Sequence, residues 1–149
     1  DCEENKAQGN ALYKKGDYRL AKAKYHKVAC QIDGIRGLEP EHFEQLEQIK
    51  VSCHLNFAQC CLRQGEHHEA ARRLSEKVLK HDPENPKALY RRGVAYTATG
   101  FFAEAREDLE RLREVDEASA KDADAALARL KREEAKFKRS EQRSFVGKL

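Results

Sequence analysis

The sequence predicts an all-α protein made of three helix–turn–helix repeats followed by a seventh, capping helix. One pattern of small, ring and apolar residues recurs three times along the 149 residues. Charged residues make up 37% of the chain and only three prolines occur, which suits helices with exposed polar faces. Apolar residues near the C-terminal end also recur at helical spacing, which predicts one further amphipathic helix.

The repeat is recognised by five positions that align in three copies. Each copy begins at a small residue and has a glycine seven residues later and a ring side chain two residues further on. An alanine follows, and then a bulky apolar residue. The aligned residues are Gly9, Ala58 and Gly93; Gly16, Gly65 and Gly100; Tyr18, His67 and Phe102; Ala21, Ala70 and Ala105; Tyr25, Leu74 and Leu109. The second copy has one extra residue, which we place after Ala70 in its second helix.

These positions indicate two helices in each unit. The first small residue allows the helices of a unit to approach closely, and the second glycine ends the first helix in a left-handed conformation. Pro40 and the Asn85–Pro86 pair are typical of helix starts. Six helices are therefore expected over residues 2–14, 18–32, 40–63, 67–80, 86–99 and 102–115.

A seventh helix is expected from about Ser119 to beyond Lys136. Its apolar stripe would cover the last repeat, as repeat arrays require for solubility, and consists of Ala123, Ala126, Leu127 and Leu130. The predicted domains are three repeats within residues 1–118 and a capping helix with a basic tail over 119–149. The repeats themselves are expected at about 2–35, 40–84 and 86–118.

Composition limits the compartment and the kind of chemistry. The five cysteines form no C-x-x-C pair, which predicts reduced thiols. Reduced thiols predict a cytoplasmic location and are also compatible with a nuclear one. The chain has no Met and is expected to be a piece of a longer protein. No apolar run approaches the roughly 20 residues of a membrane span. We expect no metal and no cofactor.

A repeat of about 34 residues with this glycine–alanine pattern resembles the tetratricopeptide repeat. The resemblance implies a right-handed superhelix in which the first helix of each unit lines a concave groove. The long third helix and the seventh helix resemble the C-terminal domain of large FK506-binding immunophilins and of the aryl-hydrocarbon-receptor-interacting protein. Small tetratricopeptide-repeat proteins with the same phrase KALYR, here at 87–91, are similar too. The similarity to immunophilins implies that a prolyl-isomerase domain precedes residue 1.

Polar side chains at fixed repeat positions resemble the two-carboxylate clamp of chaperone-binding tetratricopeptide domains. Such domains bind the C-terminal EEVD peptide of cytosolic heat-shock chaperones. Lys87 and Arg91 share a helical face and repel each other, and a bound anion would relieve that repulsion. Tyr13 shares a face with Lys6 and Asn10 and would pack against an apolar residue of the ligand. The candidate peptide-binding residues are Lys6, Asn10, Tyr13, Asn56, Lys87 and Arg91.

The resemblance also implies a role for each polar residue. Lys6, Asn10 and Asn56 would hold the terminal main-chain carboxylate. Lys87 would bind the side-chain carboxylate of the last aspartate, and Arg91 would contact the peptide just before it. The chemistry suits a doubly anionic chain end, because Lys supplies a mobile charge and Arg a fork of donors. The ninety-kilodalton heat-shock chaperone is favoured as partner over its seventy-kilodalton relative.

Catalysis is not expected from this chain. It contains no glycine-rich phosphate loop, no G-x-S-x-G and no H-E-x-x-H motif. The expected function is a protein-interaction module of a co-chaperone. Two alternatives are a scaffold that binds a client protein through other surfaces and the regulatory half of a prolyl isomerase.

The basic charge is concentrated in the tail. The net charge is +3, but residues 129–149 carry +5 and the rest −2, so a nucleic-acid partner is not indicated. With Phe137, Phe145 and Val146, this tail could bind calmodulin or an acidic surface, or dock on another copy or on the missing domain. The plainer interpretation is a solvated helix extension that frays after Ser140.

Overall fold

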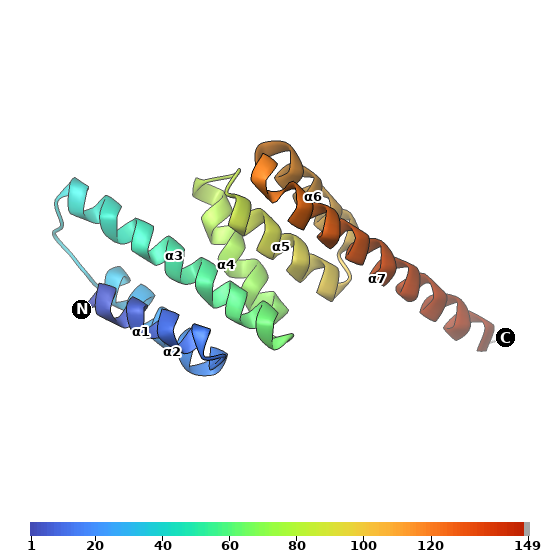
Figure 1. Ribbon diagram of the computed structural model, residues 1–149, viewed down its shortest axis with the longest axis horizontal. Coiled ribbons are helices and arrows are strands. Elements are labelled where there is room, and N and C mark those ends of the chain that lie inside the picture. The colour runs from blue at the N-terminus through green and yellow to red at the C-terminus, as the bar shows by residue number, and fades with distance from the viewer. Residues whose placement is uncertain (148–149) are drawn as a thin grey trace.

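The computed structural model describes residues 1–147, which form seven α-helices and one short 3₁₀ helix (Figure 1). Successive helices pack as antiparallel pairs, and the pairs stack side by side along the molecule (Figure 1). The helices are α1 Cys2–Lys14, α2 Tyr18–Asp33, α3 Pro40–Gln64, α4 His68–His81, α5 Pro86–Thr99, α6 Phe102–Val115, η1 Glu117–Ser119 and α7 Ala120–Gly147. The all-α prediction is confirmed, and the first six helices begin and end within one residue of the expected bounds.

Local hydrogen bonds explain where several helices begin. The carboxylates of Asp1 and Asp17 accept from backbone amides in the first turns of α1 and α2. Asn85 caps α5 in the same way, and Pro86 follows it at the first helical position. Glycines in the left-handed conformation end α3 and α5, with φ of 69° at Gly65 and 85° at Gly100.

Glycine permits close packing within the first and third helix pairs. A Cβ atom built on Gly9 would lie 2.8 Å from the ring of Tyr25, and one on Gly93 would lie 2.8 Å from the Leu109 side chain. Tyr25 and Leu109 are almost fully buried as a result. The predicted function of these small residues, close approach of two helices, is confirmed.

The second repeat corrects one feature of the alignment. His67 is exposed and adopts a left-handed φ of 57°, and α4 begins one residue later than expected. Ala71 and Ser75 are the buried residues of α4 where Ala70 and Leu74 were expected. The extra residue of this repeat therefore lies in the turn before α4. His68, rather than His67, occupies the ring position and is half-buried.

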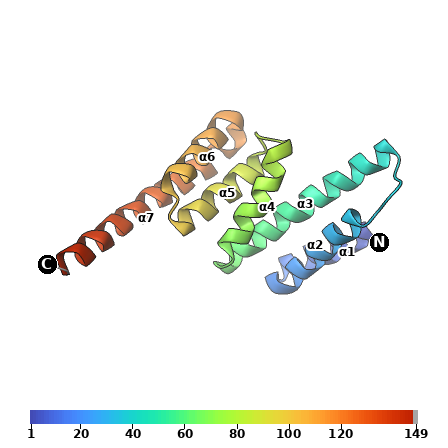
Figure 2. The same ribbon diagram turned by 180° about the vertical axis from the view of Figure 1, so that it is seen from behind.

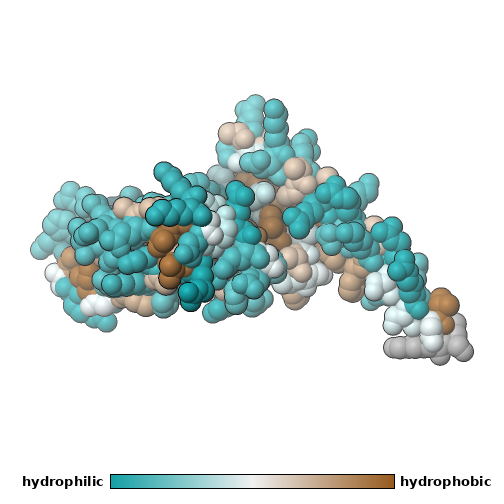
Figure 3. Space-filling model, turned by 60° about the horizontal axis from the view of Figure 1, so that its bottom comes forward, coloured by the Kyte–Doolittle hydropathy of each residue, from teal (hydrophilic) through white to brown (hydrophobic). Residues whose placement is uncertain are grey.

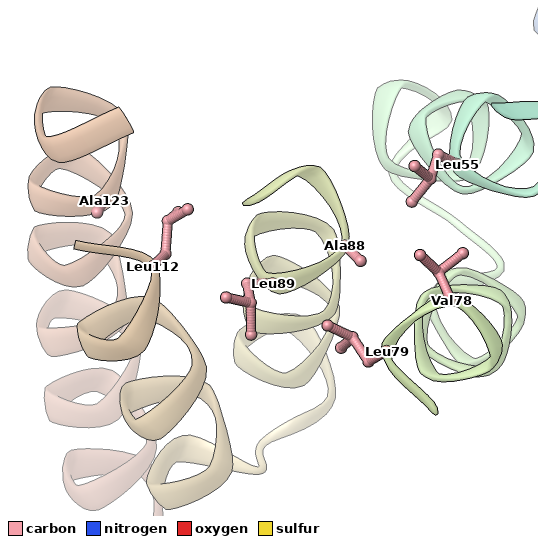
Figure 4. Packing of buried hydrophobic residues seen from close by; sticks show 7 residues of the cluster. All are labelled: Leu55, Val78, Leu79, Ala88, Leu89, Leu112 and Ala123. Atoms are coloured by element: carbon pink, nitrogen blue, oxygen red, sulfur yellow. The ribbon is translucent and has the colours of Figure 1, made fainter. Parts of the chain in front are cut away.

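One of the core clusters among residues 1–147 crosses from one helix pair to the next. Figure 4 shows one cluster to which α3, α4, α5, α6 and α7 all contribute side chains. Its members are Leu55, Val78, Leu79, Ala88, Leu89, Leu112 and Ala123. Ala123 and Leu130 of α7 are buried, and Ala126 and Leu127 pack beside Leu130. The apolar stripe predicted for the seventh helix thus covers the last pair.

The end of α7 projects beyond the other helices (Figures 1 and 2). The helix continues to Gly147, so the expected fraying after Ser140 is wrong within the described residues. Phe145 and Val146 are each 67% exposed. The molecular surface in Figure 3 is mainly hydrophilic with small separate apolar patches, one of them at this tip. No helix within residues 1–147 has the length and apolarity needed to cross a membrane.

Candidate functional site

Two asparagines from different helix pairs meet at the centre of the candidate site. The Tyr25 hydroxyl donates to Asn10 Oδ1 at 2.7 Å, and Asn56 Nδ2 donates to the same oxygen at 3.4 Å. Burial raises the pKa of Tyr25 to about 12, so its hydroxyl remains a donor at neutral pH. Because Asn10 Oδ1 accepts both bonds, the Asn10 amide group keeps its own two donors for a ligand.

Lys6 lies one turn before Asn10 on α1 and is half-buried. It lines a cavity between α1 and the beginning of α3, which we call the α1 cavity, together with Asp1, Glu3 and Gln48. Lys6 forms no ion pair within the described part of the chain. Burial raises the pKa of the nearby Cys53 thiol to about 11, and the positive charge of Lys6 opposes that rise.

Arg91 is a half-buried cation without a counter-charge. Its Nε donates to Gln59 Oε1 at 3.1 Å, while its Nη1 is buried and has no hydrogen-bond partner among residues 1–147. No carboxylate within the described residues pairs with it. Burial lowers the pKa of the Arg91 guanidinium, which is the expected effect of removing a charge from water. Lys87, one turn earlier on α5, is exposed and also forms no ion pair within residues 1–147.

A cavity of about 660 Å³, the central cavity, brings three of the six candidate residues together. Asn56, Lys87 and Arg91 line it from α3 and α5. Gln48 lines both this cavity and the α1 cavity, so the two adjoin at that side chain. Lys6 therefore lies in the neighbouring cavity, while Asn10 is joined to the central one through its hydrogen bond with Asn56.

Tyr13 is half-buried and packs edge-on against Tyr18, with 5.3 Å between the ring centroids. Interaction with the Tyr13 hydroxyl raises the pKa of the exposed Arg63 guanidinium. The predicted contact of Tyr13 with a ligand side chain stays a prediction.

Sequence reasoning missed several residues of this site. Gln59 fixes Arg91, Tyr25 fixes Asn10, and Tyr90 lines the central cavity. Helical spacing placed Gln59 one turn from Asn56 without assigning it a role, and it could have identified Tyr90, which lies three residues after Lys87. Asp116 and Asp122 also line the central cavity and were not recognised, because they lie near η1 and at the start of α7, outside the repeat positions.

The arrangement can bind an anion but offers no catalytic or metal-binding chemistry. Its cations and amides can donate hydrogen bonds to carboxylates, and the carboxylates of Asp116 and Asp122 also line the central cavity. Within residues 1–147, no group of three or more His, Cys, Asp or Glu side chains is placed to hold a metal ion. Cys53, Cys60 and Cys61 are free thiols buried in the core.

Comparison with known proteins gives matches over most of the chain. The tetratricopeptide-repeat family model matches residues 58–123. The peptidyl-prolyl cis-trans isomerase PASTICCINO1 of Arabidopsis thaliana is 35% identical over 83% of this chain, which corresponds to 19% of that protein. The chain therefore spans about a fifth of the length of the curated relatives it matches.

Solved structures extend the match to the whole fold. The C-terminal TPR-containing domain of an FK506-binding protein from Plasmodium falciparum superimposes with a TM-score of 0.80 and is 27% identical. That match covers 95% of this chain and 91% of the other. The second TPR domain of human RPAP3, solved in complex with the HSP70 peptide SGPTIEEVD, gives a TM-score of 0.65 at 24% identity over 85% of this chain and 92% of that one. The latter likeness concerns the fold alone.

Proposed function

Because this chain is a tetratricopeptide-repeat domain similar to those of FKBP-type immunophilins, a protein-interaction fold and not a catalytic one, we propose that it binds the acidic C-terminal end of a partner protein. The observation that carries the proposal is the set of cations without counter-charges around the α1 and central cavities. Lys6, Lys87 and Arg91 all lie there, and none has a carboxylate partner in residues 1–147. A ligand that supplies carboxylates would complete these contacts.

Each candidate residue has a distinct role in this proposal. Lys6 and the free amide donors of Asn10 and Asn56 bind the terminal main-chain carboxylate. Lys87, exposed at the edge of the central cavity, binds the side-chain carboxylate of a terminal aspartate. Arg91, held in place by Gln59, contacts the peptide just before its end. The neutral amides of Asn10 and Asn56 suit the position of the terminal main-chain carboxylate, because they donate hydrogen bonds without adding to the repulsion between cations.

The proposed ligand is the EEVD end of a cytosolic heat-shock chaperone. The RPAP3 domain was solved with a peptide that ends in these residues, which supports the ability of this fold to seat such a chain end. We favour the ninety-kilodalton chaperone over the seventy-kilodalton one on the resemblance to immunophilins. In this proposal the chain acts in a cytoplasmic co-chaperone, in which a separate segment supplies any isomerase activity.

The strength of the complex is limited by the cost of ordering a flexible peptide. Each charge-assisted hydrogen bond contributes roughly 1.5–3 kcal/mol. After association and ordering costs, a dissociation constant on the order of 1 µM follows for four or five such contacts. Added salt weakens the complex, because the contacts are mainly ionic and only partly shielded from water.

Isothermal titration calorimetry with a short peptide ending in EEVD tests the proposal. We expect binding to the native chain and a loss of about tenfold or more in both Lys6→Ala and Arg91→Ala. Lys27→Ala is the matched control, because Lys27 is exposed on α2 and lines none of the cavities described. Absence of binding, or binding that both groove substitutions leave unchanged, would overturn the proposal.

A further inference from the structure

The two ends of the elongated molecule carry most of its exposed large apolar side chains. One end, residues 39–44 at the start of α3, is called the α3 end; the other, residues 136–147 of α7, is called the α7 end. They lie at opposite extremes of the helix stack (Figures 1 and 2). Seven large apolar side chains are exposed within residues 1–147, and four of them belong to these ends: Phe43, Phe137, Phe145 and Val146. Large apolar side chains concentrated at exposed positions are typical of interaction surfaces.

The α3 end carries only negative charges. Glu39, Glu41 and Glu44 are exposed and form no ion pair within residues 1–147. No lysine or arginine lies between positions 37 and 49, and Arg36 donates instead to two nearby backbone carbonyl oxygens at 2.7 and 3.2 Å. Glu41 and Glu44 are three residues apart on α3 and therefore repel each other. The three carboxylates give this end a net negative charge.

The α7 end carries the opposite charge. Arg139 and Arg143 are exposed, lie four residues apart on one face of α7, and form no ion pair within residues 1–147. Val146 follows three residues after Arg143 and continues the same face, whereas Glu141 lies on the opposite face of the helix. The two lysines of this end pair with glutamates one turn earlier on α7. This face is therefore basic, with an apolar side chain at its tip.

The helix macrodipole explains only part of this arrangement. Acidic residues in a first turn and basic residues in a last turn are stabilised by the dipole, so the signs of the charges need no partner. The dipole does not account for the apolar side chains beside them, because Phe43 is 56% exposed and Val146 is 67% exposed. A contact that covers both ends would bury these side chains and also relieve the repulsion between like charges.

The opposite charges of the two ends indicate which partner fits. Two α3 ends repel each other, and so do two α7 ends, whereas the α3 end of one copy attracts the α7 end of another. A second copy of this chain therefore supplies both the complementary charge and an exposed apolar side chain. Glu41, Phe43 and Glu44 do not line the α1 cavity, so this contact leaves the candidate site open.

We propose that the chain associates with itself head to tail, the α7 end of one copy packing on the α3 end of the next. Arg139 and Arg143 pair with Glu41 and Glu44 of the neighbouring copy, and Val146 packs near its Phe43. The two surfaces are different, so the contact is heterologous and either extends along a row of copies or closes into a ring. The inference is independent of the proposed function, because these residues line neither the α1 cavity nor the central cavity.

Sedimentation velocity of the native chain in a reducing buffer tests for association. We expect the average mass to rise over a concentration series that ends at about 0.5 mM, a range suited to a weak contact between exposed charges. Raising the salt from about 0.05 M to about 0.5 M should reduce the rise, because exposed ion pairs are screened. A chain that stays monomeric throughout the series at low salt would overturn the proposal.

Charge reversal identifies the surfaces in contact. Glu41→Lys with Glu44→Lys makes both ends basic, and Arg139→Glu with Arg143→Glu makes both ends acidic. Each double variant alone should associate about tenfold more weakly than the native chain, and an equimolar mixture of the two should recover the association, because every α3 end again meets an α7 end of opposite charge. Circular dichroism verifies that both variants stay helical.

A matched control removes the effect of overall charge. Arg19→Glu with Lys27→Glu changes the net charge by the same amount as the α7 variant, at two exposed positions of α2 away from both ends. This control should associate as the native chain does. Equal weakening in the control, or a mixture of the two charge-reversed variants that stays monomeric, would overturn the proposed contact.

The apolar part of the contact has its own test. Phe43→Ser should weaken association about threefold to tenfold, because the contact loses a buried ring. Leu20→Ser removes an exposed apolar side chain from α2 and should have no effect. Equal effects of the two substitutions would contradict the packing of Phe43 between copies.

Discussion

Arg91 and Arg92 are adjacent on α5, yet they lie in opposite electrostatic surroundings. Arg92 points between α5 and α6, where its guanidinium donates two hydrogen bonds to the buried carboxylate of Asp108 at 2.8 and 2.7 Å. Arg91 lines the central cavity, where its only hydrogen bond within the described residues goes to the neutral side chain of Gln59. The pKa values change in opposite directions: the Asp108 contact raises that of Arg92, and burial lowers that of Arg91.

The difference separates a stabilising charge from a binding charge. Arg92 keeps Asp108 ionised in a buried position, although burial raises the pKa of that carboxyl group. Arg91 bears part of the cost of leaving water without an ion-pair partner among residues 1–147. Other arginines away from the cavities, such as Arg72 and Arg106, also have carboxylate partners. Arg91 therefore differs from these arginines in being half-buried without a carboxylate partner among residues 1–147.

The largest expected effect is on stability and comes from Arg92→Met. The substitution keeps the apolar stem but leaves the Asp108 carboxyl group buried without its partner, and 94% of that side chain is shielded from solvent. We expect the free energy of unfolding to fall by about 3 kcal/mol, measured by urea denaturation. The dissociation constant of an EEVD peptide for the folded protein should be unchanged.

Arg91→Met, the same substitution at the neighbouring arginine, should have the opposite outcome: stability is kept and peptide binding is weakened. Arg91→Met removes an uncompensated charge, so the free energy of unfolding should stay within about 0.5 kcal/mol of the native value. Peptide affinity should fall about tenfold to a hundredfold, because a charge-assisted contact is lost. If Arg91→Met unfolds more easily while binding is retained, the contrast between the two arginines is wrong.

A pH titration tests a second basic group whose pKa is lowered by burial, His54 of α3. Burial and the nearby Lys77 and Lys50 lower the pKa of His54 to about 4, whereas its ordinary value is 6.5. The unfolded chain therefore binds the proton more readily, so the contribution to stability is complete above about pH 6.5 and is lost as the pH falls through 4. Because the ring is partly exposed, we expect a loss of about 1–2 kcal/mol from this group.

Denaturation curves between pH 7 and pH 4 measure this loss. His54→Gln supplies the control, because its stability should depend less steeply on pH over the same interval. A variant that follows the native pH dependence would show that other groups cause the loss.

The smallest expected effect comes from Tyr25→Phe. The variant removes the hydroxyl that donates to Asn10 but keeps the ring that packs against Gly9. The free energy of unfolding should fall by about 1 kcal/mol, and peptide affinity should fall about twofold to fivefold as Asn10 loses its fixed orientation. Tyr96→Phe is a suitable control, since its hydroxyl makes a 3.5 Å contact with Glu76 and Tyr96 lines neither the α1 cavity nor the central cavity. Equal effects of both variants on binding would argue against a positioning role for Tyr25.

The fold could be predicted because its signals are local and repeated. Small residues, glycine ends and helical spacing define each hairpin, and the same signals occur three times. The turn before α4 could not be placed, because a left-handed His67 has no clear signature in the sequence. The seventh helix was expected to run beyond Lys136 and continues to Gly147; its last turns could not be placed, since charged residues with few apolar ones continue a helix as readily as they end it.

The candidate site was only partly predictable for a different reason. Repeat positions identified Asn56, Lys87 and Arg91, which share one cavity in the structure. The contrast between Arg91 and Arg92 depends on Asp108, sixteen residues away on another helix, and spacing within a single helix cannot indicate it.

The central claim is that the unpaired cations bind a chain end with two carboxylates. Calorimetric titration of the native chain with two peptides, one ending in EEVD with a free carboxylate and the other with the same sequence as a C-terminal amide, tests it most directly. The account predicts that the amide binds at least about tenfold more weakly, because the contacts of Lys6, Asn10 and Asn56 lose their anion. Equal affinities for the free acid and the amide would contradict it.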